Sequence, residues 1–112
     1  GVPTDAQFER LRRTLDESFF TFDYAAPTYV ADDLDPDRYW RGPVWANTNW
    51  LLERGLRRYG ADAAADRVRA DSLALLEREG FREYFNPHTG AGRGSDDFAW
   101  SAALYLDWTD ER

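Results

Sequence analysis

The sequence predicts an all-α fold of about four helices that form two helical hairpins. Three observations support this. Apolar residues recur at helical spacing in four segments, most of these segments carry a start or stop signal, and no segment makes a convincing β-strand. The 112 residues suffice for one small domain and are too few for two.

The first helix is predicted over residues 5–15. Thr4 and Gln7 have the spacing of a capping box, and Leu11 and Leu15 then fall on one face. A long loop is expected over residues 18–41, because that stretch contains two prolines and a cluster of four aspartates over residues 32–37, and it shows no helical period.

Three further helices follow the loop. The second is predicted over residues 43–59, with Pro43 in the first helical position and Gly60 after the last turn. The third begins at Asp62 and ends at Gly80, and the fourth covers residues 98–108. The second and fourth are apolar enough to be buried and the first and third are amphipathic, an alternation that suggests two concentric layers of helices.

Composition excludes several classes of function. The chain has no Cys and one His, which removes disulfides, thiolate metal sites and two-histidine chemistry, and we expect neither a metal nor a cofactor. The net charge of −7 repels phosphate backbones and anionic lipids, and no apolar run is long enough to span a bilayer. We therefore expect a cytoplasmic protein without nucleic-acid or membrane partners. The absence of Met suggests a processed chain or a piece of a longer one.

Aromatic residues make up 16% of the chain and gather at the predicted start of the second helix. Tyr39, Trp40 and Arg41 lie directly before it, and Trp45 follows within it. A sugar has an apolar face and a rim of hydroxyls, so flat rings beside polar side chains suit it. Each Trp could instead belong to the core, which leaves a structural role open.

A second cluster of aromatic residues surrounds one acidic residue. Glu83 lies among Phe81, Tyr84 and Phe85 in a predicted loop. Partial desolvation there would raise the pKa of Glu83 and make it a usable general base. The alternative is an acid held for structural reasons, paired with a nearby arginine.

Three stretches of the sequence, two of which contain these clusters, resemble family 63 of the glycoside hydrolases, which includes mannosylglycerate hydrolases and α-glucosidases. The resemblance is carried by residues 39–45 (YWRGPVW), 80–90 (GFREYFNPHTG) and 98–103 (FAWSAA), in this order. It implies that residues 1–112 are a C-terminal segment of a catalytic (α/α)6 barrel. It also implies hydrolysis of an α-glucosidic or α-mannosidic bond with inversion.

The resemblance further assigns roles to individual residues. It implies that Glu83 is the general base. The implied sugar-binding residues are Tyr39, Trp40, Arg41, Trp45, Phe98 and Trp100. The general acid of the family lies upstream, so the chain alone is expected to be inactive and to need the N-terminal part of the barrel as its partner. The alternative is a non-catalytic helical module that binds sugar or protein through an aromatic surface.

Overall fold

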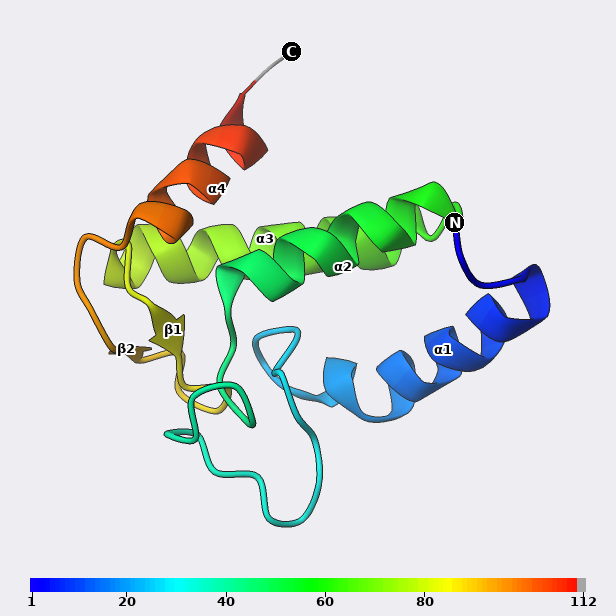
Figure 1. Cartoon of the computed structure of the whole chain (residues 1–112), viewed down its shortest axis with the longest axis horizontal. Helices are drawn as coiled ribbons and strands as arrows, with labels where there is room; N and C mark the ends of the chain where they lie inside the picture. The colour runs from blue at the N-terminus through cyan, green and yellow to red at the C-terminus, as the bar shows by residue number, and fades with distance from the viewer. Residues whose placement is uncertain (111–112) are drawn as a thin grey trace.

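Helices dominate residues 1–110, the part of the chain that the computed structural model describes (Figure 1). The elements, in chain order, are α1 (Asp5–Glu17), a 3-10 turn η1 (Phe19–Thr21), α2 (Ala46–Arg58), α3 (Asp62–Glu79), β1 (Tyr84–Phe85), β2 (Gly92–Arg93) and α4 (Ala99–Thr109). The predicted all-α class with four helices is confirmed. The expectation of no strand is wrong in one place, because Tyr84 pairs with Arg93 in a two-residue antiparallel ladder.

Capping determines where α1 begins, whereas loop pairing determines where α2 begins. The Thr4 hydroxyl accepts from the Gln7 amide, and the Gln7 side chain accepts in return from the Thr4 amide. Pro43, however, is not the first residue of α2. Its carbonyl accepts from the Thr28 amide, and Val44 forms bridges with Pro27 and Phe85. The helix therefore starts only at Ala46.

The two long helices α2 and α3 lie side by side and form the centre of the molecule (Figure 1). Gly60 makes the turn between them with φ of 76°, a conformation that glycine adopts without strain. The Ala61 amide then donates to the Leu56 carbonyl, which satisfies one of the free carbonyls at the end of α2. A predicted helical hairpin is thus confirmed here.

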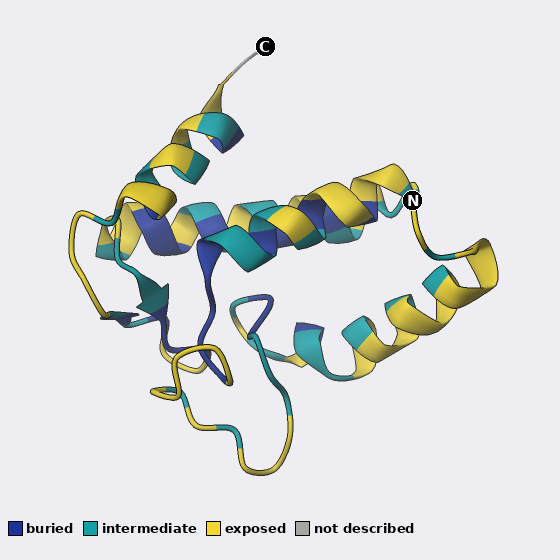
Figure 2. Cartoon of the chain, in the orientation of Figure 1, coloured by how far each residue is buried: buried dark blue, intermediate teal, exposed yellow. Residues whose placement is uncertain are grey.

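Helix α4 is less buried than its sequence predicts. Only Ser101 and Trp108 are buried among its residues, while Trp100 is 53% and Leu106 is 68% exposed (Figure 2). Helix α3, predicted to be amphipathic, buries five residues of its inward face. The prediction of a buried α4 is therefore wrong for these residues, because within residues 1–110 the helix packs on one side only.

The molecule is a slab of about 41 × 40 × 21 Å, and its short dimension matches two layers of helices, each about 10 Å across. Two clusters of buried side chains lie along the α2–α3 pair. One includes Leu56 and Val68, which pack with Phe20 of the 3-10 turn. The other includes Leu75 of α3, Phe85 of the hairpin and Trp108 of α4. None of the helices in the described part is long and apolar enough to cross a bilayer.

Candidate active site

Aromatic rings from three segments meet at the start of α2. The Trp40 ring stacks on Trp45 with the ring centroids 3.6 Å apart, and the Tyr84 ring also stacks on Trp45, at 5.3 Å. The Tyr39 ring stands edge-on to Trp45 at 4.8 Å. Phe98, just before α4, closes the cluster edge-on to Trp45 at 6.5 Å. The tertiary structure therefore brings together rings that are far apart in the sequence.

The aromatic cluster combines a buried ring, Trp45, with rings that are open to solvent. Trp45 is only 1% exposed, and its indole Nε1 donates to the Tyr39 carbonyl at 2.7 Å. Trp40 is 43% exposed, and Trp100, whose ring lies 5.1 Å from Phe98, is also open to solvent. Trp45 is thus a core residue beneath the rings that a ligand can reach.

Glu83 lies at the edge of the cluster. Its Oε2 accepts a hydrogen bond from the Tyr39 hydroxyl, and its Oε1 accepts from the Ser95 backbone amide at 3.1 Å. The Ser95 carbonyl in turn accepts from the Glu83 amide at 3.0 Å, so Ser95 binds both the backbone and the side chain of Glu83. The alternative pairing with arginine is not seen, because Arg82 pairs with Asp96 and Arg93 with Asp37.

The expected direction of the Glu83 pKa is wrong. The hydrogen bond from the Tyr39 hydroxyl lowers the Glu83 pKa most, the Ser95 amide lowers it further, and the opposing effect of burial is smaller. Donors that stabilise the charged form outweigh desolvation. Glu83 is therefore a carboxylate at neutral pH, with neutral groups as its donors.

Tyr39 occupies an unusual backbone conformation. Its φ is 38°, in the left-handed region that non-glycine residues rarely adopt. Strain of this kind persists where the surroundings enforce it. Here the Trp45 indole binds the Tyr39 carbonyl and the Glu83 carboxylate binds its hydroxyl. Both ends of the residue are thus fixed.

Arg41 is the one predicted site residue that lies apart from this cluster. Its guanidinium is exposed and stacks over the Tyr29 ring, with 5.5 Å between the guanidinium carbon and the ring centroid. The Tyr29 hydroxyl donates to Asp33 at 2.6 Å. Arg41 therefore belongs to the 18–41 loop in this structure.

Two residues that contact the site are not among the predicted catalytic and sugar-binding residues. Tyr84 stacks on Trp45, and Ser95 supplies an amide to Glu83. The pairing of Tyr84 with Arg93 sets both of them in place. The turn signals between residues 86 and 94 could have suggested a hairpin, and a hairpin would have placed residue 95 beside Glu83.

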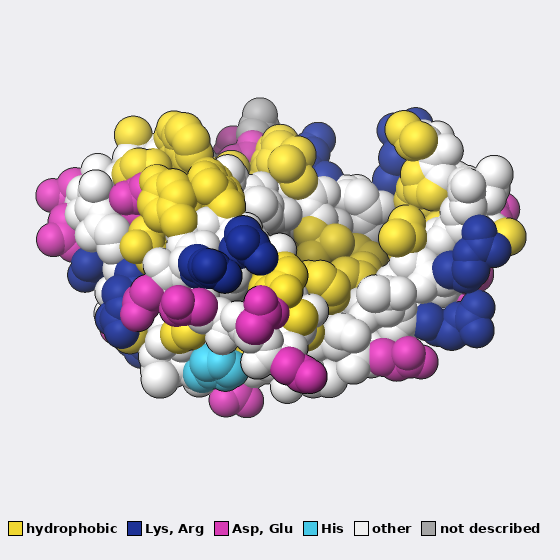
Figure 3. Space-filling model, turned by 60° about the horizontal axis from the view of Figure 1, so that its bottom comes forward, with side chains coloured by type: hydrophobic (Ala, Val, Ile, Leu, Met, Phe, Trp, Pro, Cys, Tyr) yellow, Lys and Arg dark blue, Asp and Glu magenta, His cyan; other side chains and the backbone are white. Residues whose placement is uncertain are grey.

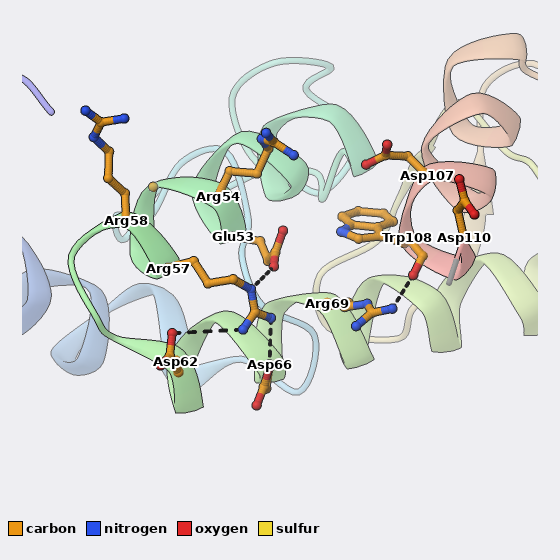
Figure 4. Close-up of a pocket in the computed structure, with 11 residues that line it drawn as sticks. Glu53, Arg54, Arg57, Arg58, Asp62, Asp66, Arg69, Asp107, Trp108 and Asp110 are labelled. Carbon is orange, nitrogen blue, oxygen red and sulfur yellow. Dashed lines mark hydrogen bonds and ion pairs between the residues drawn. The ribbon is translucent and has the colours of Figure 1, made fainter. Parts of the chain in front are cut away.

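A separate open cavity of about 1090 Å³ lies between α2, α3 and the end of α4 (Figure 4). Arg57 lies on its wall and pairs with Glu53 at 2.5 Å and with Asp66 at 2.7 Å. The pair with Asp66 ties α2 to α3, and the hydrogen bonds to Asp66 and Glu53 raise the Arg57 pKa. None of the predicted site residues lines this cavity, so the aromatic cluster remains the candidate active site.

An ionised carboxylate beside exposed aromatic rings, at the loop ends of paired helices, is the arrangement expected of a carbohydrate-cleaving enzyme. Comparison with known proteins identifies the family. The chain belongs to the mannosylglycerate hydrolase MGH1-like glycoside hydrolase domain family, whose model matches residues 1–101. It is thus a member of glycoside hydrolase family 63, as its sequence strings indicated.

Similar proteins agree with this assignment. A mannosylglycerate hydrolase of Thermus thermophilus is 63% identical over 76 residues, which are 68% of this chain and 18% of that protein. Mannosylglycerate hydrolase MGH1 of Selaginella moellendorffii is 40% identical and covers 96% of this chain and 22% of its own length. The chain thus spans about a fifth of the length of these relatives.

Solved structures show the same fold. The crystal structure of a family 63 mannosylglycerate hydrolase from Thermus thermophilus in complex with glucose matches with a TM-score of 0.92 and 47% identity. The match covers 98% of this chain and 28% of that one. The four helices therefore have the arrangement of part of a family 63 barrel.

Proposed function

We propose that residues 1–112 form a C-terminal segment of the catalytic domain of an inverting α-glycosidase, with Glu83 as the general base. The observation that supports this most is the Glu83 carboxylate, which is ionised, fixed by the Tyr39 hydroxyl and the Ser95 amide, and placed beside aromatic rings. The names of the relatives make mannosylglycerate the first substrate to test. Glucosylglycerate is the second, because a relative 39% identical over 79 residues is a glucosylglycerate hydrolase.

The lowered pKa suits Glu83 to one of the two carboxyl roles. An inverting glycosidase needs a protonated acid on the leaving oxygen and a carboxylate that activates water on the opposite face of the sugar. A group held in its charged form can accept a proton from water but has none to give. Glu83 therefore takes the base role, and the acid comes from the part of the domain outside this chain. The chain alone is expected to be inactive.

The sugar is expected to bind against the exposed rings of the aromatic cluster. Trp40 and Trp100 offer faces to solvent, and Phe98 lies between Trp45 and Trp100. Tyr39 orients Glu83, and the buried Trp45 supports Trp40 from below. Arg41 is proposed to bind a polar group at the rim of the site, since its guanidinium is exposed.

A chimera tests this proposal. The chain replaces the matching region of the Thermus thermophilus mannosylglycerate hydrolase, and hydrolysis of mannosylglycerate is measured. Glu83→Gln keeps the size and the acceptor oxygen of the side chain but removes its basicity. We expect it to remove most of the turnover and to change substrate binding little. Turnover close to that of the unmodified chimera would contradict the assignment of Glu83.

The second candidate function is sugar binding without catalysis, which the exposure of Trp40 and Trp100 favours. It requires the isolated chain to bind a sugar on its own. Titration of the isolated chain with mannose and with glucose, followed by tryptophan fluorescence, separates the two candidates. Saturable binding together with an active Glu83→Gln chimera would favour the binding module.

A further inference from the structure

Arg82 directly precedes the candidate base Glu83 and forms an ion pair with Asp96, with 2.9 Å between its Nε and the Asp96 Oδ1. Basic and acidic side chains lie beside exposed hydrophobic ones on the face of the molecule shown in Figure 3. The Asp96 side chain is 76% exposed, and an ion pair this open to solvent contributes little to stability. Its position indicates another role, because Asp96 directly follows Ser95, whose amide binds Glu83.

The Arg82 side chain contacts both neighbours of Ser95. Its Nη2 donates to the Gly94 carbonyl at 3.2 Å, and its Nε pairs with Asp96. A planar guanidinium holds two partners in fixed directions, whereas a lysine ammonium is a single point charge. Between these two contacts, the Ser95 amide donates to Oε1 of Glu83 at 3.1 Å. The direction of this amide therefore depends on the contacts that Arg82 makes.

Arg82 is itself fixed to the rest of the molecule. The hydroxyl of Ser101, a buried residue of α4, donates to the Arg82 carbonyl at 2.7 Å, and the Arg82 amide donates to the Gly80 carbonyl at 2.8 Å. A Cβ atom added to Gly92 would lie 2.5 Å from the Arg82 Cγ, so the stem of the side chain lies against β2. The guanidinium thus extends from a fixed backbone and can hold residues 94–96 in place.

Gly94 leaves the space that the Glu83 carboxylate occupies. Its φ is 69°, a conformation that glycine adopts without strain. A Cβ atom added there would lie 2.7 Å from Oε1 of Glu83 and 2.8 Å from Cε1 of Tyr84. Both distances are too short for a real contact, so no side chain fits at this position while the carboxylate stays in place. The residue that Arg82 holds is therefore in direct contact with the candidate base.

We propose, on the basis of the proposed function, that Arg82 is a positioning residue for the general base, because it holds residues 94–96 where they orient the Glu83 carboxylate. In this role Arg82 touches neither the sugar nor the attacking water. Misplacement of a reacting group by about 1 Å can cost about 100-fold in rate, so a side chain behind the base can control turnover.

The orientation of the backbone, rather than the charge of Arg82, is what Glu83 responds to. Within residues 1–110 the Tyr39 hydroxyl lowers the Glu83 pKa most, Ser95 lowers it next, and burial opposes both. None of these groups is charged. Arg82 therefore acts on the carboxylate through Ser95, and the two effects can be separated by experiment.

NMR titration of the full 112-residue chain tests the proposal directly. In the unmodified chain the Ser95 amide proton should titrate with the Glu83 carboxyl, because one binds the other. Arg82→Gln keeps most of the stem but removes the guanidinium. We expect the Ser95 amide to lose most of its titration amplitude, and the Glu83 pKa to rise toward its ordinary value as this donor moves away. Arg82→Lys keeps the charge without the planar group and should behave in the same way.

Arg78→Gln is the matched control for the arginine. Arg78 also donates to a carbonyl of the hairpin at 3.2 Å, that of Thr89, and also pairs with an acidic residue, Glu79. The variant therefore removes the same charge and the same kind of contact, away from residues 94–96. It should leave both the Ser95 amplitude and the Glu83 pKa unchanged.

Gly94→Ala tests the other half of the proposal, with Gly90→Ala as its control. Gly90 has a φ of 74°, so alanine is strained at both positions. A Cβ atom on Gly90 would meet Arg78 and Tyr24 instead of Glu83. Both variants should lose stability, but only Gly94→Ala should change the Glu83 pKa.

Kinetics of the chimera give the second readout, at a temperature where circular dichroism shows every variant folded. Arg82→Gln and Gly94→Ala should lower kcat for mannosylglycerate by about 10- to 100-fold, because the base is misplaced. They should change KM by less than about threefold, since the exposed rings remain. The acidic limb of the kcat/KM profile should move to higher pH. Arg78→Gln and Gly90→Ala should keep kcat.

Two results would overturn the proposal. One is a Ser95 amide that keeps its full titration amplitude in Arg82→Gln. The other is a shift of the Glu83 pKa in Arg82→Gln that Arg82→Lys reverses, which would make the charge the cause. If Arg82→Gln does not fold, Asp96→Asn removes one of the two contacts from an exposed position, and the same readouts apply. An active Glu83→Gln chimera would contradict Glu83 as base, whereas the NMR readouts concern only how its carboxylate is held, so the two failures are distinguishable.

Discussion

The Tyr39 hydroxyl donates a hydrogen bond to Oε2 of Glu83 across 44 positions of sequence. This contact joins the strained end of the 18–41 loop to the hairpin that contains β1, and it lowers the Glu83 pKa more than any other interaction does. It raises the Tyr39 pKa for the same reason, since loss of the phenolic proton would bring a second negative charge beside the carboxylate. The candidate base is therefore held by a side chain from the other aromatic string.

Tyr39→Phe is expected to raise the Glu83 pKa toward its ordinary value, because the main donor to the carboxylate is lost. Titration of the Glu83 side-chain carboxyl by NMR in the isolated chain measures this shift. In the chimera the acidic limb of the kcat/KM profile should move to higher pH in parallel. Tyr29→Phe is the control, since the Tyr29 hydroxyl binds Asp33 rather than Glu83. An unchanged Glu83 pKa in Tyr39→Phe would contradict the role given to Tyr39.

Trp40 and Trp45 stack on each other, but we expect removal of Trp45 to reduce stability and removal of Trp40 to weaken sugar binding. Trp45→Ala removes a buried ring and should lower the free energy of unfolding by about 3–5 kcal/mol. Trp40→Ala removes a half-exposed ring and should cost much less stability, while raising KM for the sugar in the chimera. Urea unfolding and steady-state kinetics separate the two effects. A large KM change with full stability in Trp45→Ala would mean that its ring reaches the sugar directly.

The sequence predicted the helices better than it predicted their surroundings. Capping and breaker signals are local, so the start of α1 at Thr4 and the end of α3 at Gly80 could be read directly. The start of α2 could not, because Pro43 and Val44 are held by partners from residues 27–28 and 85 that no local pattern reveals. The burial of α4 depends on which neighbours are present, and helical periodicity does not contain that information.

In the candidate site, too, the residue types could be read from the sequence, whereas the contacts between distant segments could not. The residue types around Glu83 indicated a desolvated acid, whereas the structure places it at the edge of the aromatic cluster, bound by the Tyr39 hydroxyl. The direction of its pKa was wrong because the two donors, the Tyr39 hydroxyl and the Ser95 amide, come from distant segments. Trp45 was ambiguous for a related reason. Whether a Trp is core or binding surface depends on which ring lies above it, and here Trp40 does.

Asn49 links the loop before α2 to the α2–α3 pair, and its loss should be costly. This buried side chain accepts from the Ala26 amide and donates to the Ala25 carbonyl and the Ser72 hydroxyl. Asn49→Ala leaves the Ala26 amide and the Ala25 carbonyl without this partner, so we expect a loss of about 3 kcal/mol in urea unfolding. Asn47→Ala, two residues earlier, should cost less than about 1 kcal/mol, because its Oδ1 has no hydrogen-bond partner within residues 1–110. Equal costs would refute this difference.

Gly42 and Gly55 should respond to alanine with opposite signs. A Cβ atom on Gly42 would run into the Asp35 backbone carbonyl, so the 18–41 loop would have to move. Gly42→Ala is expected to destabilise the chain by about 2 kcal/mol. Gly55→Ala is expected to stabilise it by about 1 kcal/mol, because Gly55 lies inside α2 and a Cβ atom there would meet nothing within 4 Å among residues 1–110. Thermal unfolding of both variants provides the comparison. A neutral Gly42→Ala would mean that the loop can shift without cost to the fold.

The hairpin should be the acid-sensitive part of the fold, because two carboxylates with lowered pKa values bind its backbone. Glu79 accepts from the Gly92 amide at 2.8 Å and Glu83 accepts from the Ser95 amide. The Gly92 amide is the largest cause of the lowered Glu79 pKa. Since the native pKa of each group lies below its unfolded value, their stabilisation is complete above the unfolded pKa of about 4.3 and is lost as pH falls through the native pKa.

Glu79→Gln keeps an acceptor for the Gly92 amide but removes the titrating charge. The urea midpoint of the variant should therefore fall less between pH 5 and pH 3 than that of the unmodified chain, and its Gly92 amide NMR shift should lose its acid titration. Glu9→Gln, an exposed position on α1, should retain both responses of the unmodified chain. If the Gly92 amide still titrates in Glu79→Gln, then another carboxylate controls the hairpin. If the Gly92 amide no longer titrates in Glu79→Gln, Glu79 is the group that controls it. We then expect acid to open the hairpin first, because Glu79 binds the Gly92 amide and Glu83 binds the Ser95 amide.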